Sequence, residues 1–378
     1  MTQRIAGHLL VECLLAQGVT HVFGVPGESY LAALDGFYAH RDAIEFIVCR
    51  QEGGAAFMAE AHGKLTRRPG VCFVTRGPGA TNASIGLHTA AQDSTPMVLL
   101  VGDVASDQRD REAFQEVDYR AFFGAFGMAK RVERIDSAER MPEYVARAFA
   151  TALNGRPGPV VLVLPEDLLT QSVPDALQPL PRWEPPAYAP DAAGLARLTE
   201  LLAAARQPFV IAGGSGWTPE AARDLQRFAE AWHLPVGTAM RFQDTFDNAH
   251  PLYAGDVGIA INPRLAARIK AADLVLAIGP RLGEMTTGGY TLLEVPQPRQ
   301  KLVHVHPSAE ELGRVYLPEL ALCASLPAMA RALAALPAPA AAAWRDWTDA
   351  AHADYEVNLQ PQALPGPVDM AAIVAVLQ

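Results

Sequence analysis

Four short segments of the chain combine polar side chains with glycine or proline, at residues 24–28, 50–54, 75–82 and 113–118. The second segment contains Glu52, a carboxylate followed by two glycines, which leave room beside it for a flat ligand. The third is a glycine-rich turn of the kind whose backbone N–H groups can bind anions. Its letters, GPGATN, match neither a dinucleotide fingerprint nor a phosphate-binding P-loop. Together these residue types would allow a flat ligand to bind beside a carboxylate.

These segments also have simpler interpretations when each is taken alone. The turn at 24–28 is typical of an ordinary strand-to-helix connection, and 113–118 is typical of a surface loop. Glu52 could be the N-cap of a helix, where the positive end of the helix dipole stabilises a carboxylate. The residue pattern by itself leaves both kinds of interpretation open.

The elements that must position these segments alternate between strand-like and helix-like patterns. Amphipathic or alanine-rich stretches predict helices at 3–17, 31–38, 53–63 and 80–91. Apolar runs predict strands at 21–25, 44–49, 71–75, 97–102 and 160–164, the second of them buried on both faces. This alternation predicts an α/β fold with doubly wound, mostly parallel sheets. Such sheets bind ligands at the carboxyl ends of their strands, which is where the turns at 24–28 and 50–54 are expected.

A proline-rich stretch divides the chain. Residues 174–190 contain six prolines, which predicts an extended linker between a first domain, 1–173, and a second, 191–335. The second domain has predicted strands at 209–212, 273–279 and 302–305 and a predicted helix at 219–232. Residues 336–378 contain another Ala/Pro-rich segment, a break at 360–367, and an apolar helix that Asp369 should cap. The pattern leaves open whether that helix docks on the second domain or begins a third.

The composition is typical of a globular protein. The 378 residues are 50% hydrophobic and carry a net charge of −10, with no run of Lys or Arg, which argues against a nucleic-acid partner. No apolar stretch is long enough to span a membrane, and the N-terminus does not look like a signal peptide. The four cysteines lack CxxC spacing, so we expect reduced thiols in a cytoplasmic protein.

Taken together, in order and spacing, the segments resemble the pyrimidine-binding domain of thiamine-diphosphate enzymes of the acetolactate synthase type. The matching stretches are FGVPGESY, RQEGGAAFMAEAHGK, GVCFVTRGPGATNASIGLHTAAQDSTPMVLLVGDV, REAFQEVD and GRPGPVVLVLPEDLL. The resemblance implies a pyrimidine-binding domain followed by a central Rossmann-like domain. It also implies thiamine-diphosphate-dependent decarboxylation of a small 2-oxo acid such as pyruvate, with carboligation.

The resemblance assigns roles to residues of the first domain. In this family a glutamate at the position of Glu52 hydrogen-bonds N1′ of the cofactor's aminopyrimidine and promotes loss of the thiazolium C2 proton. Pro26, Gly27, Pro78 and Asn82 match positions that line the pyrimidine. A poorly solvated Glu52 is therefore implied, with its glycine neighbours as clearance for the ring.

A second set of residues is implied to face the substrate. Phe114 and Gln115 match positions on the substrate side of the cofactor, and Gln115 joins Glu52 as an implied catalytic residue. Lys130 aligns loosely with a lysine further along the family pattern, and it is included in this set.

Four residues of the first domain depart from the family pattern. Gln51, Gly53, Glu28 and Arg76 stand where many relatives carry His, Gln, Gly and Ser. These changes leave the implied cofactor activation intact, but they leave the substrate and the acceptor unassigned.

The second domain also departs from the pattern. Of the stretch that accompanies FAD in the family, only Gly279 and Arg281 are kept, so FAD is implied weakly. His304 and His306 share one face of a predicted strand, where core or solvated histidines are expected ahead of a metal pair.

The resemblance also concerns what this chain lacks. The family's third domain binds the diphosphate through Mg²⁺ with a Gly-Asp-Gly motif and a later Asn. This chain has two Gly-Asp pairs, Gly102-Asp103 and Gly255-Asp256, and neither of them continues into that motif. We therefore expect 336–378 to be a linker and the first helix of a truncated third domain, and the fragment to be inactive alone. A homodimer or homotetramer with the active site at the subunit interface is implied.

Two other functions remain open at this point. One is a simple 2-oxo acid decarboxylase or another thiamine-diphosphate lyase. The other is a non-catalytic binding module built from the two domains.

Overall fold

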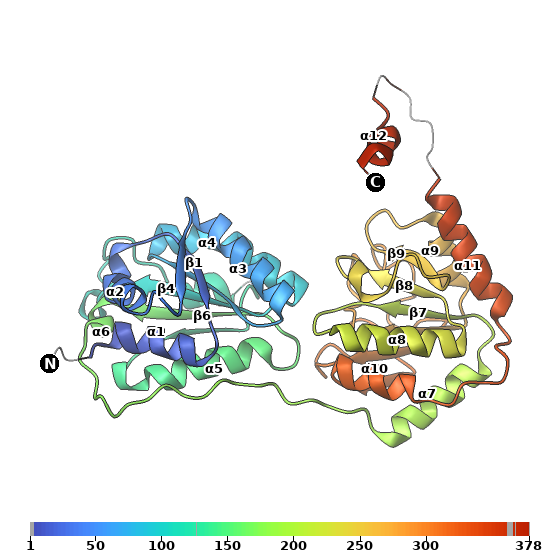
Figure 1. The fold of residues 1–378 in the computed structure, drawn as a ribbon, viewed down its shortest axis with the longest axis horizontal. Helices are drawn as coiled ribbons and strands as arrows, with labels where there is room; N and C mark the ends of the chain where they lie inside the picture. The colour runs from blue at the N-terminus through green and yellow to red at the C-terminus, as the bar shows by residue number, and fades with distance from the viewer. Residues whose placement is uncertain (1–3, 126, 361–365, 367, 378) are drawn as a thin grey trace. The chain divides into compact units, whose positions relative to one another are not determined.

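The chain folds into two compact units, Met1–Pro186 and Ala187–Gln378 (Figure 1). The computed structural model describes residues 4–125, 127–360, 366 and 368–377. Across these residues, no helix combines the length and the apolar character that a membrane crossing requires.

The first unit is built on a six-stranded parallel sheet with the order β2-β1-β3-β4-β6-β5. The strands are β1 (His21–Gly24), β2 (Glu45–Val48), β3 (Gly70–Val74), β4 (Met97–Asp103), β5 (Arg131–Arg134) and β6 (Pro159–Pro165). The α-helices are α1 (Ala6–Ala16), α2 (Leu31–Ala39), α3 (Glu52–Thr66), α4 (Gly77–Asp93), α5 (Met141–Leu153) and α6 (Glu166–Leu169). Helices α1 and α5 cover one face of the sheet and α3 and α4 the other, as Figure 1 shows. The predicted doubly wound α/β fold is thereby confirmed.

The order of the strands reverses on either side of β1. The chain runs from β1 to β2 on one side and then crosses back to β3 on the other, so a topological switch point lies between β1 and β3. The register aligns the strand ends here, because Gly24 pairs with Val48 of β2 and with Phe73 of β3. Switch points at the carboxyl ends of strands are the usual ligand sites of open parallel sheets.

One expectation about the first unit was wrong, and two of its elements were missed. Strand β2 is not buried on both faces, because it forms an edge of the sheet and the Val48 side chain is 67% exposed. The edge strand β5 and helix α5 were not predicted at all. The sequence of β5, RVER, is too short and too polar to give a strand signal.

The proline-rich stretch that leaves the first unit contains no helix or strand from 174 to 190. Its first part is tied to the first unit, since the Gln17 side-chain amide donates to the carbonyl oxygens of Leu180 and Pro181 at 3.2 and 3.0 Å. Arg68 also pairs with Glu184 at 2.6 Å. The extended backbone that proline favours is therefore held in place by side chains of the domain that precedes it.

The second unit contains another six-stranded parallel sheet, with the order β12-β11-β10-β7-β8-β9. Its strands are β7 (Pro208–Ala212), β8 (Val236–Ala239), β9 (Tyr253–Val257), β10 (Leu274–Ile278), β11 (Lys301–His306) and β12 (Leu320–Cys323). Its helices are α7 (Ala192–Ala204), α8 (Pro219–Trp232), α9 (Pro263–Ala271), α10 (Leu326–Ala334), α11 (Arg345–Asn358) and α12 (Met370–Leu377). The predicted helix 219–232 coincides with α8, which has the strongest amphipathic pattern of the chain.

The last helix begins as predicted. The Asp369 carboxylate accepts hydrogen bonds from the backbone N–H groups of Ala371 and Ala372, at 2.9 and 3.4 Å, which is the contact of an N-cap. Most of the predicted break at 360–367, namely residues 361–365 and 367, lies outside the described residues.

Candidate active site

The turn between β3 and α4 is the centre around which the predicted site residues gather. The Thr75 hydroxyl lies 2.9 Å from the Ser29 hydroxyl, which joins this turn to the one that follows β1. Gly27 packs against the same threonine so closely that a Cβ atom on Gly27 would lie 2.5 Å from the Thr75 Cβ. Only glycine fits there, so the 24–28 and 75–82 segments form one packed unit at the switch point.

Glu52 is the first residue of α3, but it is not the N-cap. The capping role belongs to Gln51, whose side-chain oxygen accepts the backbone N–H of Gly54 at 2.9 Å. The interpretation of Glu52 as a helix cap is therefore wrong, and its carboxylate is available for another partner. The side chain is half-buried at the carboxyl edge of the sheet.

The partner of Glu52 comes from the turn after β3. The Asn82 side-chain amide donates a hydrogen bond to Glu52 Oε2 at 3.0 Å. Glu52 Oε1 accepts no hydrogen bond from any residue that the structure describes, and a Cβ atom on Gly79 would lie 3.6 Å from it. A Cβ atom on Gly54 would meet no atom within 4 Å. One carboxylate oxygen is therefore fixed, while the other has no described hydrogen-bond partner and has a glycine, Gly79, as its neighbour.

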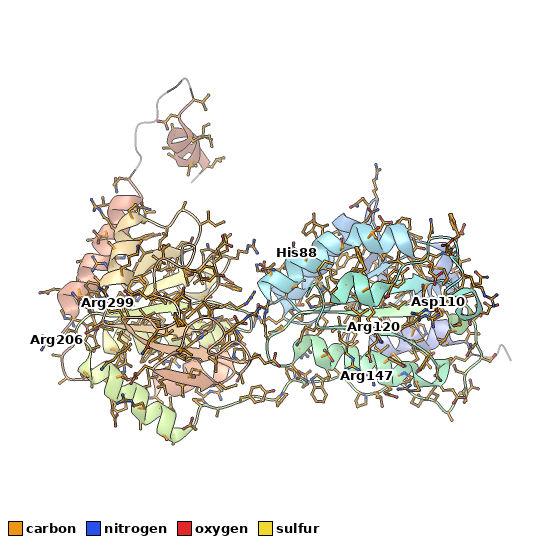
Figure 2. All side chains as sticks on the ribbon, turned by 180° about the vertical axis from the view of Figure 1, so that it is seen from behind. His88, Asp110, Arg120, Arg147, Arg206 and Arg299 are labelled. Atoms are coloured by element: carbon orange, nitrogen blue, oxygen red, sulfur yellow. The ribbon has the colours of Figure 1, made fainter. Side chains whose placement is uncertain are left out.

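The predicted substrate-facing loop meets the same turn. A Cβ atom on Gly77 would lie 2.5 Å from the Gln115 carbonyl oxygen, so the two backbones are in direct contact. The Gly77 N–H also donates to the hydroxyl of Tyr119 at 3.0 Å. Phe114 is 75% exposed, and the loop around Gln115 lines an open cavity of about 600 Å³. Figure 2 labels Asp110 and Arg120, which flank this loop, on the first unit.

Lys130 is not brought to this group. It immediately precedes β5, and its backbone N–H donates to the carbonyl of Pro159, the first residue of β6. Its ammonium group donates to the carbonyl oxygens of Asn154 and Arg156 at 2.7 and 2.8 Å. Lys130 therefore lies at the amino ends of the strands, the opposite edge of the sheet from Glu52, and it fastens the end of α5.

The remaining predicted residues are placed by their neighbours in the chain. Pro26 is exposed directly before Gly27, and Pro78 is exposed in the first turn of α4, one residue after Gly77. The structure thus assembles Pro26, Gly27, Glu52, Pro78, Asn82 and Gln115 on the connections that follow β1, β2, β3 and β4.

Three residues that shape the site were missed by sequence reasoning. Two of them are Thr75 and Tyr119. The third is Tyr30, whose hydroxyl donates to the Val25 carbonyl and whose ring stacks on Phe73 with centroids 4.0 Å apart. A threonine at a strand end and two tyrosines near turns carry no distinctive pattern. Only their contacts across the sheet reveal them.

Burial raises the pKa values of two titratable groups near Glu52. The pKa of the Cys72 thiol is raised by burial, then by Cys49 and by the carboxylate of Glu52. The pKa of the Tyr30 hydroxyl is raised for the same reason, burial first and the charges of Cys72 and Glu52 after it. Both groups therefore stay protonated at neutral pH, and neither is a nucleophile.

The histidine pair of the second unit is buried and hydrogen-bonded to the backbone. His304 Nε2 lies 3.0 Å from the Pro280 carbonyl oxygen, and His306 Nδ1 lies 3.0 Å from the Ser308 nitrogen. Burial lowers the pKa of His304. These contacts are those of core histidines, which is the interpretation expected from the sequence.

Comparison with known proteins gives a consistent result for both units. A family model described as "Thiamine pyrophosphate enzyme, N-terminal TPP binding domain" matches residues 4–122. A second, described as "Thiamine pyrophosphate enzyme, central domain", matches residues 195–333.

Among curated proteins, the chain is 32% identical over 310 residues to the probable acetolactate synthase large subunit of Methanocaldococcus jannaschii, covering 81% of this chain and 51% of that protein. It is 31% identical over 324 residues to the acetolactate synthase isozyme 2 large subunit of Escherichia coli strain K12, covering 86% and 58%. It is 32% identical over 314 residues to the glyoxylate carboligase of Escherichia coli O157:H7, covering 81% and 51%. The chain spans about half the length of these relatives.

Proposed function

This chain belongs to the thiamine pyrophosphate enzyme family, and from that premise we propose that it takes part in decarboxylation of a small 2-oxo acid followed by carboligation. The observation that carries the proposal is the Glu52 carboxylate, with one oxygen held by Asn82 at 3.0 Å and the other next to Gly79 and without a hydrogen bond from the described residues. Relatives named acetolactate synthase and glyoxylate carboligase support a 2-oxo acid as the substrate class.

The residues present fit the aminopyrimidine half of thiamine diphosphate. A protonated ring nitrogen needs a carboxylate acceptor, and Glu52 Oε1 provides one. A flat ring needs neighbours without side chains, and Gly79 is one of them, since its added Cβ would lie 3.6 Å from Glu52 Oε1. Pro26, Gly27 and Pro78 are proposed to line the ring from the turns on either side.

Bound thiamine diphosphate would supply a nucleophilic carbon and an electron sink for decarboxylation of the 2-oxo acid. The chain's own residues would act on protons and on position. Glu52 would share a proton with the ring nitrogen through Oε1, while Asn82 keeps the carboxylate plane fixed. Gln115, on the loop packed against Gly77, would direct its side-chain amide toward polar atoms of the substrate.

We propose that Mg²⁺ and the diphosphate are held by groups outside residues 1–378, because the Gly-Asp-Gly and Asn pattern does not occur in the sequence. A homodimer or homotetramer of the complete gene product is also proposed, on the resemblance to the family alone. The four cysteines are free thiols, which supports a cytoplasmic location.

The second unit does not fit FAD in the same way. A Cβ atom on Gly214 would lie 1.9 Å from the Gly279 carbonyl oxygen, so these glycines serve close backbone packing. At the start of α8 the Thr218 hydroxyl accepts the Ala221 N–H at 3.1 Å. Glu220 adds a carboxylate in the same first turn, which disfavours a phosphate group at this helix end.

In the test, the complete gene product that contains this chain is incubated with thiamine diphosphate, Mg²⁺ and one of two acids, pyruvate or glyoxylate. We expect CO₂ release together with a carboligation product from one of the two acids. The variant Glu52→Gln should lose both, whereas Glu45→Gln, an exposed residue at the start of the edge strand β2, should retain them. CO₂ release without a carboligation product would favour simple decarboxylation, and consumption of neither acid would overturn the proposal.

A further inference from the structure

Tyr119 joins two parts of the site that lie far apart in the sequence. Its side chain is 4% exposed, and its ring stacks on that of Phe123 with centroids 6.4 Å apart. Its hydroxyl accepts the backbone N–H of Gly77 at 3.0 Å, in a buried hydrogen bond that spans 42 residues. The first N–H groups of a helix have no partner within the helix, so this hydroxyl satisfies a donor at the start of α4.

The backbones on either side of this hydrogen bond are both unusual. Gly77 has a φ of 26° and Gln115 a φ of 65°, a conformation that residues with side chains rarely adopt. The two residues are in backbone contact, since a Cβ atom on Gly77 would lie 2.5 Å from the Gln115 carbonyl oxygen. A strained loop residue, Gln115, is therefore held against a helix start that needs glycine, and Tyr119 is the side chain that ties them together.

The same turn leads directly to Glu52. Five residues after Gly77 on α4, Asn82 donates its hydrogen bond to the Glu52 carboxylate. The residues that follow β2, β3 and β4 are thus linked in one series of contacts, from Glu52 through Asn82 and Gly77 to Gln115 and Tyr119.

We propose that Tyr119 is a positioning residue that sets the place of the substrate-facing loop relative to the cofactor-facing carboxylate. The roles of Gln115 and Glu52 in this statement rest on the proposed function. The coupling between the loop around Gln115 and the turn at Gly77 does not rest on the proposed function, because it follows from their contacts alone.

The hydroxyl is suited to a fixed structural contact. Burial, opposed by the hydrogen bond from Gly77, raises the pKa of Tyr119 to about 12. The group is therefore neutral at any pH at which the protein would work, and it accepts the Gly77 N–H without a charge that changes with pH.

The test compares Tyr119→Phe with the matched control Tyr144→Phe. Tyr144, which lies on α5 away from the site, is also buried, at 5% exposed, and its hydroxyl donates to Asp136 at 2.9 Å. Each variant keeps its ring and loses one hydroxyl contact. Amide hydrogen exchange is measured on the complete gene product without cofactor, in peptides that cover 75–82 and 109–118.

We expect exchange in both peptides of Tyr119→Phe to quicken about tenfold, the effect of losing one buried hydrogen bond, with no such change in Tyr144→Phe. If exchange at 75–82 stays within about twofold of wild type, the proposal is overturned. A second variant, Gly77→Ala, keeps Tyr119 but places a methyl group against the Gln115 carbonyl oxygen. This steric clash should displace the loop and quicken its amide exchange. Gly77→Ala replaces Tyr119→Phe if Tyr119→Phe does not fold, and unchanged exchange at 109–118 would then overturn the proposal.

Turnover separates this inference from the proposed function. With thiamine diphosphate, Mg²⁺ and the 2-oxo acid, Tyr119→Phe should lower kcat and raise KM, because both Gln115 and Glu52 lose their common anchor. If Glu52→Gln is as active as wild type, the proposed function fails, and the exchange result alone decides whether loop and turn are coupled.

Discussion

Asn82 Nδ2 donates a hydrogen bond to Glu52 Oε2 at 3.0 Å, and this contact joins the start of α3 to the first turns of α4. This hydrogen bond holds the carboxylate in one orientation at the carboxyl ends of the strands. Gln51 makes this arrangement possible, because it caps α3 itself and leaves Glu52 free for Asn82.

The first prediction concerns Glu52 itself. Glu52→Gln keeps the shape of the side chain and can still contact Asn82, but it cannot share a proton with a ring nitrogen. We expect exchange of the C2 hydrogen of bound thiamine diphosphate to slow by about 100-fold or more, a typical contribution of acid–base catalysis. The measurement is deuterium exchange of the bound cofactor in the complete gene product. Exchange at the wild-type rate would show that Glu52 is not the residue involved.

The second prediction concerns Asn82. Asn82→Ala removes the donor to Glu52 and leaves the carboxylate free to rotate, so we expect C2 exchange to slow by about tenfold. The fold should be unaffected, because Asn82 is exposed on α4. Thr81→Ala, at the neighbouring exposed position, is the control. An equal loss in both variants would mean that the helix surface, and not the contact with Glu52, is responsible.

These contacts also show where prediction from sequence succeeded. The strands β1, β3, β4 and β6 were predictable because each is a short apolar run next to glycine or proline, and their order along the chain predicted a parallel sheet. The resemblance to a family also singled out Glu52 and Asn82, which the structure brings into contact, while their roles stay a prediction.

What the sequence does not contain is the set of contacts across the sheet. β5 was missed because an edge strand with two arginines and a glutamate has no apolar pattern. Tyr119 was missed because its importance comes from a hydrogen bond to Gly77, 42 residues away in the chain. Lys130 was assigned to the substrate side by alignment, although its position beside the first residue of β6 places it at the other edge.

The third prediction separates stability from cofactor binding at Gly54. Gly54→Ala adds a methyl group where no atom lies within 4 Å, near the start of α3. Replacing a helical glycine by alanine should stabilise the fold by about 0.5–1 kcal/mol. Because residues two apart on a helix lie on different faces, the added methyl group points away from the Glu52 carboxylate, and affinity for thiamine diphosphate should stay unchanged. Thermal unfolding and calorimetric titration measure the two effects, and a loss of affinity would place the ring on the Gly54 side of α3. Gly124→Ala, also without close neighbours, is the control.

The fourth prediction tests the position of Lys130. Lys130→Met removes two hydrogen bonds to the carbonyl oxygens of Asn154 and Arg156, so we expect a loss of about 1 kcal/mol in the free energy of unfolding. Turnover of the 2-oxo acid should not change, because the side chain points away from the carboxyl edge. A loss of kcat with normal stability would return Lys130 to the substrate side.

The fifth prediction is a pH dependence in the second unit. Burial lowers the pKa of His304 from its ordinary value of 6.5, so the unfolded chain takes up the proton more readily than the native one. Stability from this group is complete above pH 6.5 and is lost as the pH falls from 6.5 toward the lowered native pKa, with a slope of up to about 1.4 kcal/mol per pH unit. His304→Gln keeps a side-chain N–H for the Pro280 carbonyl and does not titrate, so its thermal unfolding should depend less on pH in this range. The same pH dependence in wild type and His304→Gln would show that another group is responsible.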